Sequence, residues 1–78
     1  MGIQKGKTFE VRDVFVDYDF EEVMFRWDHA NQLIYRKFYG KLEDPDPIAH
    51  HSKLFNDSLL FGDEISSEQY LEGKVRRL

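Results

Sequence analysis

The sequence contains no cysteine and no long apolar run. Without cysteine, the chain has no disulfide bond, no thiolate-bound metal and no cysteine nucleophile. No segment approaches the ~20 apolar residues that a membrane-spanning helix needs, and the N-terminus lacks the apolar stretch of a signal peptide. We therefore expect a soluble, cytoplasmic protein that does not contact a membrane and is stabilised by side-chain packing.

The sequence also lacks the motifs of common enzyme classes, such as a glycine-rich phosphate loop or Gly-x-Ser-x-Gly. Three histidines are present, but adjacent His50 and His51 would point about 100° apart on a helix, and His29 lies in a predicted turn. Carboxylates also cluster, at Asp17, Asp19, Glu21 and Glu22. We interpret them as a solvated acidic edge, because paired catalytic acids require a cleft. The sequence predicts a protein without catalytic activity, metal or other cofactor.

The length of 78 residues indicates a single small domain. Such a domain buries only ~60% of the surface that its unfolded chain exposes, so its core is thin. Seven phenylalanines, four tyrosines and one tryptophan provide large rings to fill that core. We expect a flexible N-terminus over residues 1–6 and one α+β domain over residues 7–78.

Strand patterns dominate the first half of the chain. Two runs rich in aromatic and β-branched residues flank the polar tetrapeptide at 28–31, which predicts a β-hairpin. Residues 8–18 also suit a strand, although their apolar residues change face near Arg12 and Asp13. A twist or a β-bulge would explain that change. The three strands would form an antiparallel meander.

The second half of the chain predicts two helices. Asp46 followed by Pro47 is typical of a helix start, with the helix running to about residue 61; Ser52 is an alternative N-cap for a shorter helix. Gly62 is expected to end this helix in the left-handed conformation.

Ser66 and Gln69 form a capping box for a final short helix, with Ile65 and Tyr70 as its hydrophobic staple and Gly73 at its end. The predicted order is β-β-β-α-α, an α+β fold with a three-stranded antiparallel meander and both helices packed on one face of the sheet.

A sheet covered on one face leaves aromatic and basic side chains on the other. The residues predicted to bind a partner are Arg26, Tyr35, Arg36, Lys37 and Tyr39. We expect a small protein-interaction or regulatory module of adaptor or inhibitor type, of the kind common in bacteria and phages, with an unidentified protein partner. The alternative is a single-stranded nucleic-acid-binding protein that stacks bases on this face, although the net charge of −4 argues against it.

Two further expectations concern packing. Trp27 should be largely buried and should anchor the hairpin to Phe55 or Leu59. Two open sheet edges and surplus aromatic residues predict a symmetric homodimer. Its interface should include Tyr35 or Tyr39 and should leave out the loop at 41–45.

Overall fold

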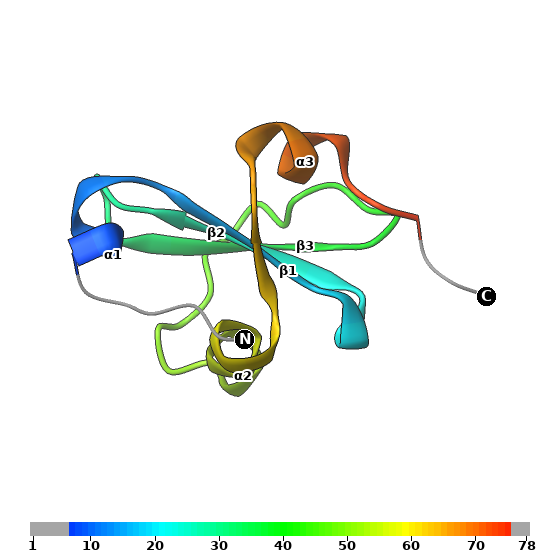
Figure 1. Ribbon diagram of the computed structural model, residues 1–78, viewed down its shortest axis with the longest axis horizontal. Coiled ribbons are helices and arrows are strands. Elements are labelled where there is room, and N and C mark those ends of the chain that lie inside the picture. The colour runs from blue at the N-terminus through cyan, green and yellow to red at the C-terminus, as the bar shows by residue number, and fades with distance from the viewer. Residues whose placement is uncertain (1–6, 76–78) are drawn as a thin grey trace.

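A four-stranded antiparallel sheet with helices on both faces forms the centre of the computed structural model, which describes residues 7–75 (Figure 1). The elements in chain order are α1 (Lys7–Val11), β1 (Val14–Tyr18), η1 (Asp19–Glu21), β2 (Val23–Asp28), β3 (Leu33–Phe38), α2 (Lys53–Phe61), β4 (Asp63–Ile65) and α3 (Ser67–Glu72). The strands lie in the order β3-β2-β1-β4. The predicted α+β class is confirmed. The predicted count of three strands and the placement of both helices on one face are wrong.

Residues 7–11 are helical, whereas a strand was expected over residues 8–18. Phe9 in α1 is buried in the core, and its carbonyl oxygen accepts a 2.6 Å hydrogen bond from the Trp27 indole N–H. The Asp13 carboxylate then accepts hydrogen bonds from the backbone N–H of His29 (3.0 Å) and from its Nδ1 (2.6 Å). The change of face near Asp13 therefore marks a helix-to-strand junction, with no bulge.

The hairpin is confirmed, with β2 and β3 paired antiparallel from Val23 opposite Phe38 to Asp28 opposite Leu33. Its turn is fixed by the Asp28 carboxylate, which accepts hydrogen bonds from the backbone N–H groups of Ala30 and Asn31. Such an Asx-type turn explains why a polar tetrapeptide follows the strand.

The fourth strand, β4, pairs with the edge of β1 that a meander would leave open. Phe15 lies opposite Ile65 and Asp17 lies opposite Asp63. At the other edge, the loop after β3 folds back along that strand. The N–H of Asp44 donates to the carbonyl of Arg36 at 2.8 Å, and residue 48 pairs with residue 34 in the same way. The open edges that motivated the homodimer are thus partly occupied; the dimer itself stays a prediction.

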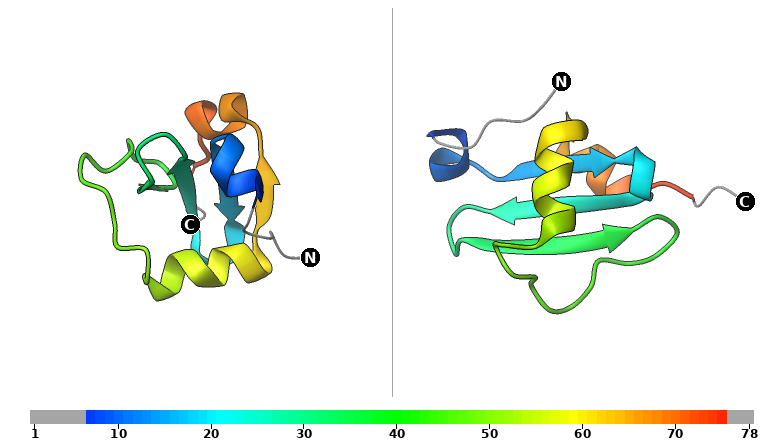
Figure 2. Two further views of the ribbon diagram at one scale, coloured as in Figure 1. Left: turned by 90° about the vertical axis from the view of Figure 1, so that its left-hand side faces the viewer. Right: turned by 90° about the horizontal axis from the view of Figure 1, so that it is seen from below.

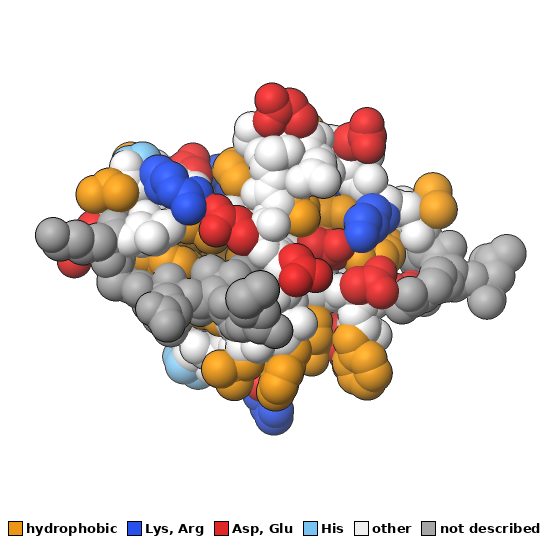
Figure 3. Space-filling model, viewed as in Figure 1, with side chains coloured by type: hydrophobic (Ala, Val, Ile, Leu, Met, Phe, Trp, Pro, Cys, Tyr) orange, Lys and Arg blue, Asp and Glu red, His pale blue; other side chains and the backbone are white. Residues whose placement is uncertain are grey.

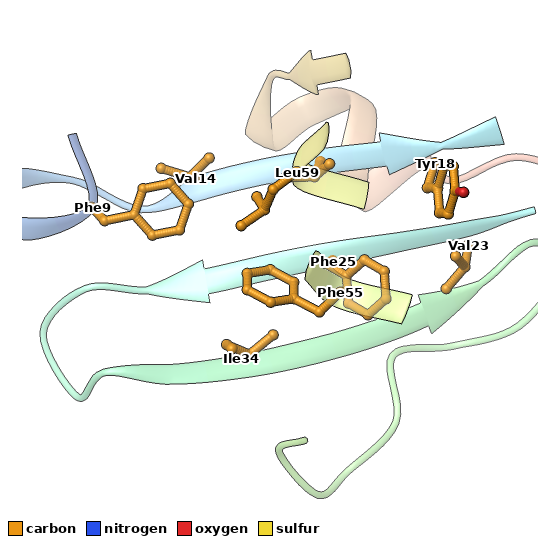
Figure 4. Close-up of a cluster of buried hydrophobic side chains, with 9 residues drawn as sticks. Phe9, Val14, Tyr18, Val23, Phe25, Ile34, Phe55 and Leu59 are labelled. Carbon is orange, nitrogen blue, oxygen red and sulfur yellow. The ribbon is translucent and has the colours of Figure 1, made fainter. Parts of the chain in front are cut away.

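The first core lies between the sheet and α2, which runs across the strands (Figure 2, right). Its buried members include Val14, Val16, Val23, Phe25 and Ile34 from the sheet, with Phe55 and Leu59 from α2 (Figure 4). Phe25 and Phe55 meet edge to face, with ring centroids 5.4 Å apart. The N–H of Phe55 donates to the Ser52 hydroxyl, so the shorter helix is correct and the start at Asp46–Pro47 is wrong.

Trp27 lies at the margin of this core and is half-buried. Its ring packs against Phe9 at 5.4 Å and meets His50 edge-on at 5.6 Å. The predicted anchoring role on Phe55 belongs to Phe25 instead, because Phe25 lies in the middle of the sheet beneath α2.

The second core lies on the opposite face, beneath α3. Buried Met24, Tyr39 and Tyr70 pack with Phe15 and Ile65. The capping box of α3 is confirmed. The backbone N–H of Gln69 donates to the Ser66 hydroxyl, and the backbone N–H of Ser66 donates to the side-chain oxygen of Gln69. Gly73 ends the helix as expected.

Gly62 ends α2 as expected, but its backbone is extended (φ −89°, ψ −176°) and not left-handed. Glycine is needed there because two backbone atoms approach closely. A Cβ would lie 2.6 Å from the carbonyl oxygen of Ser58 and 2.8 Å from that of Asp17. The missing side chain lets the end of α2 rest directly on the end of β1.

Candidate protein-interaction site

Four of the five predicted binding residues lie on the α3 side of the sheet. The pairing of β2 with β3 places Arg26, Tyr35 and Lys37 on that face, and Tyr39 belongs to the core beneath α3. Arg36 lies on the opposite face, where its guanidinium bonds to Asp44 at 2.9 Å. The five residues therefore do not form one surface.

Arg26 takes part in a half-buried polar network. Its guanidinium lies over the ring of Tyr35 at 4.4 Å and donates to both carboxylate oxygens of Glu43 at 2.9 and 3.0 Å. The Tyr70 hydroxyl donates to the same carboxylate at 2.6 Å. Burial raises the pKa of Glu43, but the hydrogen bonds from Arg26 and Tyr70 outweigh it, so the pKa lies below its ordinary value. The network ties the loop after β3 to the sheet and to α3.

Lys37 fastens the other side of α3. Its ammonium donates to the carbonyl oxygens of Tyr70 (2.6 Å) and Leu71 (3.1 Å). These carbonyls belong to the last turn of the helix, where a cation is electrostatically favoured. The charge of Lys37 is therefore engaged within the molecule.

Tyr39 is 2% exposed and cannot contact a partner in the folded state. Its hydroxyl donates to Asp17 at 2.5 Å and to Asp19 at 3.1 Å. Burial and these carboxylates raise the pKa of Tyr39 well above its ordinary range. Asp17 also receives the ammonium of Lys74 at 2.5 Å. The acidic edge is thus solvated only in part: Asp17 is buried, while Asp19 and Glu21 are exposed.

The aromatic and basic residues of the hairpin therefore mostly hold α3 and the loop in place. Whether the exposed parts of Arg26, Tyr35 and Arg36 also contact a partner stays a prediction. Among residues 7–75, no three histidine, aspartate or glutamate side chains lie close enough to hold a metal ion. In the same part of the chain, no helix is long and apolar enough to cross a membrane.

Large hydrophobic side chains are exposed elsewhere: Val11 and Val75 near the two ends of the described chain, and two further groups. Phe20 in η1, with Leu60 and Phe61 at the end of α2, forms what we call the α2–η1 surface; these side chains are 79%, 61% and 70% exposed. Leu42 and Leu71 lie beside a shallow cavity of about 350 Å³ near the end of α3.

Sequence analysis missed the α2–η1 surface. A signal was present, because Leu60 and Phe61 do not share the apolar stripe of Phe55 and Leu59 on α2. Phe20 stands alone among acidic residues in a short connection between two strands. Large apolar side chains outside a core-facing pattern are the residues to examine for binding.

Comparisons with known proteins point to one family. Residues 1–74 match the family model described as Tis1 immunity protein. The "Immune protein Tis1" of Pseudomonas aeruginosa (strain UCBPP-PA14) is 51% identical over 73 residues, which span 94% of this chain and 95% of that protein. The fold matches a chain in the crystal structure of the complex between the type VI effector Tas1 and its immunity protein, with a TM-score of 0.94 and 48% identity; the match covers 96% of this chain and 99% of that one.

Proposed function

The chain belongs to the Tis1 immunity protein family, and from this we propose that it is an immunity protein that binds a type VI effector and neutralises it. The observation that carries the proposal is the likeness, in sequence and fold and over nearly the whole chain, to a protein solved in complex with such an effector. The fold is shared over 96% of this chain at 48% identity.

We infer that the protein acts by stoichiometric binding and not by catalysis. Its polar residues on the α3 side are engaged with one another, as in the contact of Arg26 with Glu43 and that of Tyr39 with Asp17. Among residues 7–75, no buried side-chain nitrogen or oxygen lacks a hydrogen-bond partner. These networks stabilise the fold and leave binding to the exposed side chains.

The experiment is calorimetric titration of the purified chain into the type VI effector produced by the same organism. We expect a 1:1 complex with a dissociation constant on the order of nanomolar, as for interfaces of standard size. A type VI effector of an unrelated family serves as the control and should give no heat of binding. Absence of binding to the cognate effector at micromolar concentrations, with a folded chain by circular dichroism, would contradict the proposal.

A further inference from the structure

Three large apolar side chains are exposed to solvent on the α2–η1 surface. Phe20, Leu60 and Phe61 are each more than 60% exposed. Figure 3 shows hydrophobic side chains gathered along the lower side of the molecule, over α2 and η1. Contiguous apolar groups of this size on a small protein mark an interaction surface.

The turn that carries Phe20 is held by backbone hydrogen bonds at both of its ends. The N–H of Glu22 donates to the carbonyl of Asp19 at 3.1 Å, and Glu22 adopts the left-handed conformation with φ 55°. The carbonyl of Glu22 accepts the N–H of Tyr39 at 3.0 Å, which fastens the turn to the end of β3. On the other side, Tyr18 is buried and its ring lies 6.2 Å from that of Phe20. Phe20 is thus presented without the entropy cost of ordering a loop on binding.

The end of α2 is held against the end of β1, the strand that leads into this turn. Gly62 packs on the carbonyl of Asp17, the residue immediately before Tyr18 in β1. Gly62 directly follows Phe61, and Asp17 lies three positions before Phe20. The contact therefore joins the two segments that carry the phenylalanines. The two phenylalanines therefore flank one tightly packed junction and form a preorganised pair of anchors.

The border of this surface is acidic. Asp19, Glu21 and Asp63 are exposed beside the junction, and Figure 3 shows acidic side chains over the β4 edge, directly above the hydrophobic ones. Lys74 lies among these carboxylates, and its pKa is raised by its hydrogen bond to Asp17 and by the charges of Asp19 and Asp63. The ammonium offsets part of the negative charge, and a net negative border remains.

Resting on the proposed function, we propose that the α2–η1 surface is the face that contacts the effector, and that the effector supplies an apolar pocket bordered by arginine or lysine side chains. Charge complementarity selects this occupant, because an acidic border attracts a basic one and speeds association. A second copy of this chain is a poor fit. Association through this surface would bring two borders of net negative charge together, and like charges repel.

Binding of variants to the cognate effector tests the assignment. We expect the double variant Phe20→Ala/Phe61→Ala to lose affinity on the order of 100-fold, because buried aromatic anchors dominate interface energies. The matched control is Leu42→Ala/Leu71→Ala, which removes two equally exposed apolar side chains near the end of α3 and should change affinity less than about threefold. Thermal midpoints near wild type would show that both variants fold.

A charge reversal tests the border separately. Glu21→Lys should slow association with the effector several-fold and reduce its dependence on salt, with little change in dissociation. The inference is overturned if wild type binds while the Phe20/Phe61 variant binds equally well, or if only the Leu42/Leu71 variant loses affinity; the proposed function then stands. Loss of self-association in the Phe20/Phe61 variant, with effector binding unchanged, would assign the surface to a second copy and likewise overturn it. Failure of wild type to bind refutes the proposed function and with it the inference.

Discussion

Replacing Gly62 by alanine tests the junction between α2 and β1 that positions the α2–η1 surface. The φ of −89° suits alanine, so no backbone strain is introduced. If only chain entropy mattered, alanine would stabilise the protein by ~0.4–1 kcal/mol through the unfolded state. The structure predicts the opposite, because the new Cβ would lie 2.6 Å from the Ser58 oxygen and 2.8 Å from the Asp17 oxygen.

Both of these oxygens belong to the backbone, so neither can rotate away. The end of α2 must instead move off β1, which loosens Val16, 3.2 Å from the added carbon, and Leu59 beneath it. Overpacking of this kind costs ~1–3 kcal/mol. The total free energy of unfolding of a domain of this size is ~4–12 kcal/mol. Each kcal/mol of destabilisation lowers the thermal midpoint by ~4–8 °C.

We therefore expect Gly62→Ala to lower the thermal midpoint by on the order of 10 °C and to lower the urea midpoint, measured by far-ultraviolet circular dichroism. Phe61→Ala, at the neighbouring position, is the matched control. It removes a side chain that is 70% exposed and should change the stability by less than ~0.5 kcal/mol. An alanine variant at 62 as stable as wild type would refute the close contact of α2 with β1.

Three further predictions concern single interactions. Ser66→Ala should cost on the order of 1 kcal/mol of unfolding free energy by losing the N-cap of α3, while Ser67→Ala, whose exposed hydroxyl bonds only to the neighbouring side chain, should be neutral in the same urea titration. Trp27→Phe keeps an aromatic side chain, although a smaller one, and loses the 2.6 Å hydrogen bond to the Phe9 carbonyl; we expect a loss of at least ~1 kcal/mol of unfolding free energy by circular dichroism, and an unchanged midpoint would count against this bond. Burial raises the pKa of Glu43, but the hydrogen bonds from Arg26 and Tyr70 outweigh it, so the pKa lies below its ordinary value of 4.5. The folded state then binds fewer protons than the unfolded chain, so stability present above about pH 4.5 is lost as the pH falls through the folded pKa. Glu43→Gln should lack this part of the acid dependence, and an identical pH profile would contradict it.

Local signals in the sequence predicted the elements that depend on neighbouring residues. The alternating runs around residues 28–31 gave the hairpin, and the Ser66–Gln69 spacing gave the capping box, because both depend on hydrogen bonds within a few positions. The class of function, a small bacterial protein-interaction module, also followed from the short chain without catalytic motifs and agrees with the immunity family.

Features that depend on distant contacts were not predictable in this way. Strand β4 has three residues, two of them acidic, and is a strand because β1 offers an unpaired edge. Gly62 was read as a left-handed helix end because a close approach to Asp17, 45 positions away, leaves no mark on the sequence. Helices on opposite faces follow from β4, since the chain crosses the sheet edge between α2 and α3.

The α2–η1 surface proposed here was not predicted, for a related reason. Aromatic and basic residues on the hairpin resembled a binding face, but their partners, such as Glu43 for Arg26 and the end of α3 for Lys37, come from segments far along the chain. Phe20 shows the reverse case: a single phenylalanine in a polar connection has little local meaning until the fold places it beside the end of α2.

Growth protection measures the central claim, neutralisation of an effector, most directly. The effector of the same organism is produced in a bacterial host under inducible control, with or without this chain. The account predicts that the effector alone arrests growth and that equal production of this chain restores it, whereas the Phe20→Ala/Phe61→Ala variant at the same level restores it less. Growth arrest that persists with the folded wild-type chain present in excess would contradict the account.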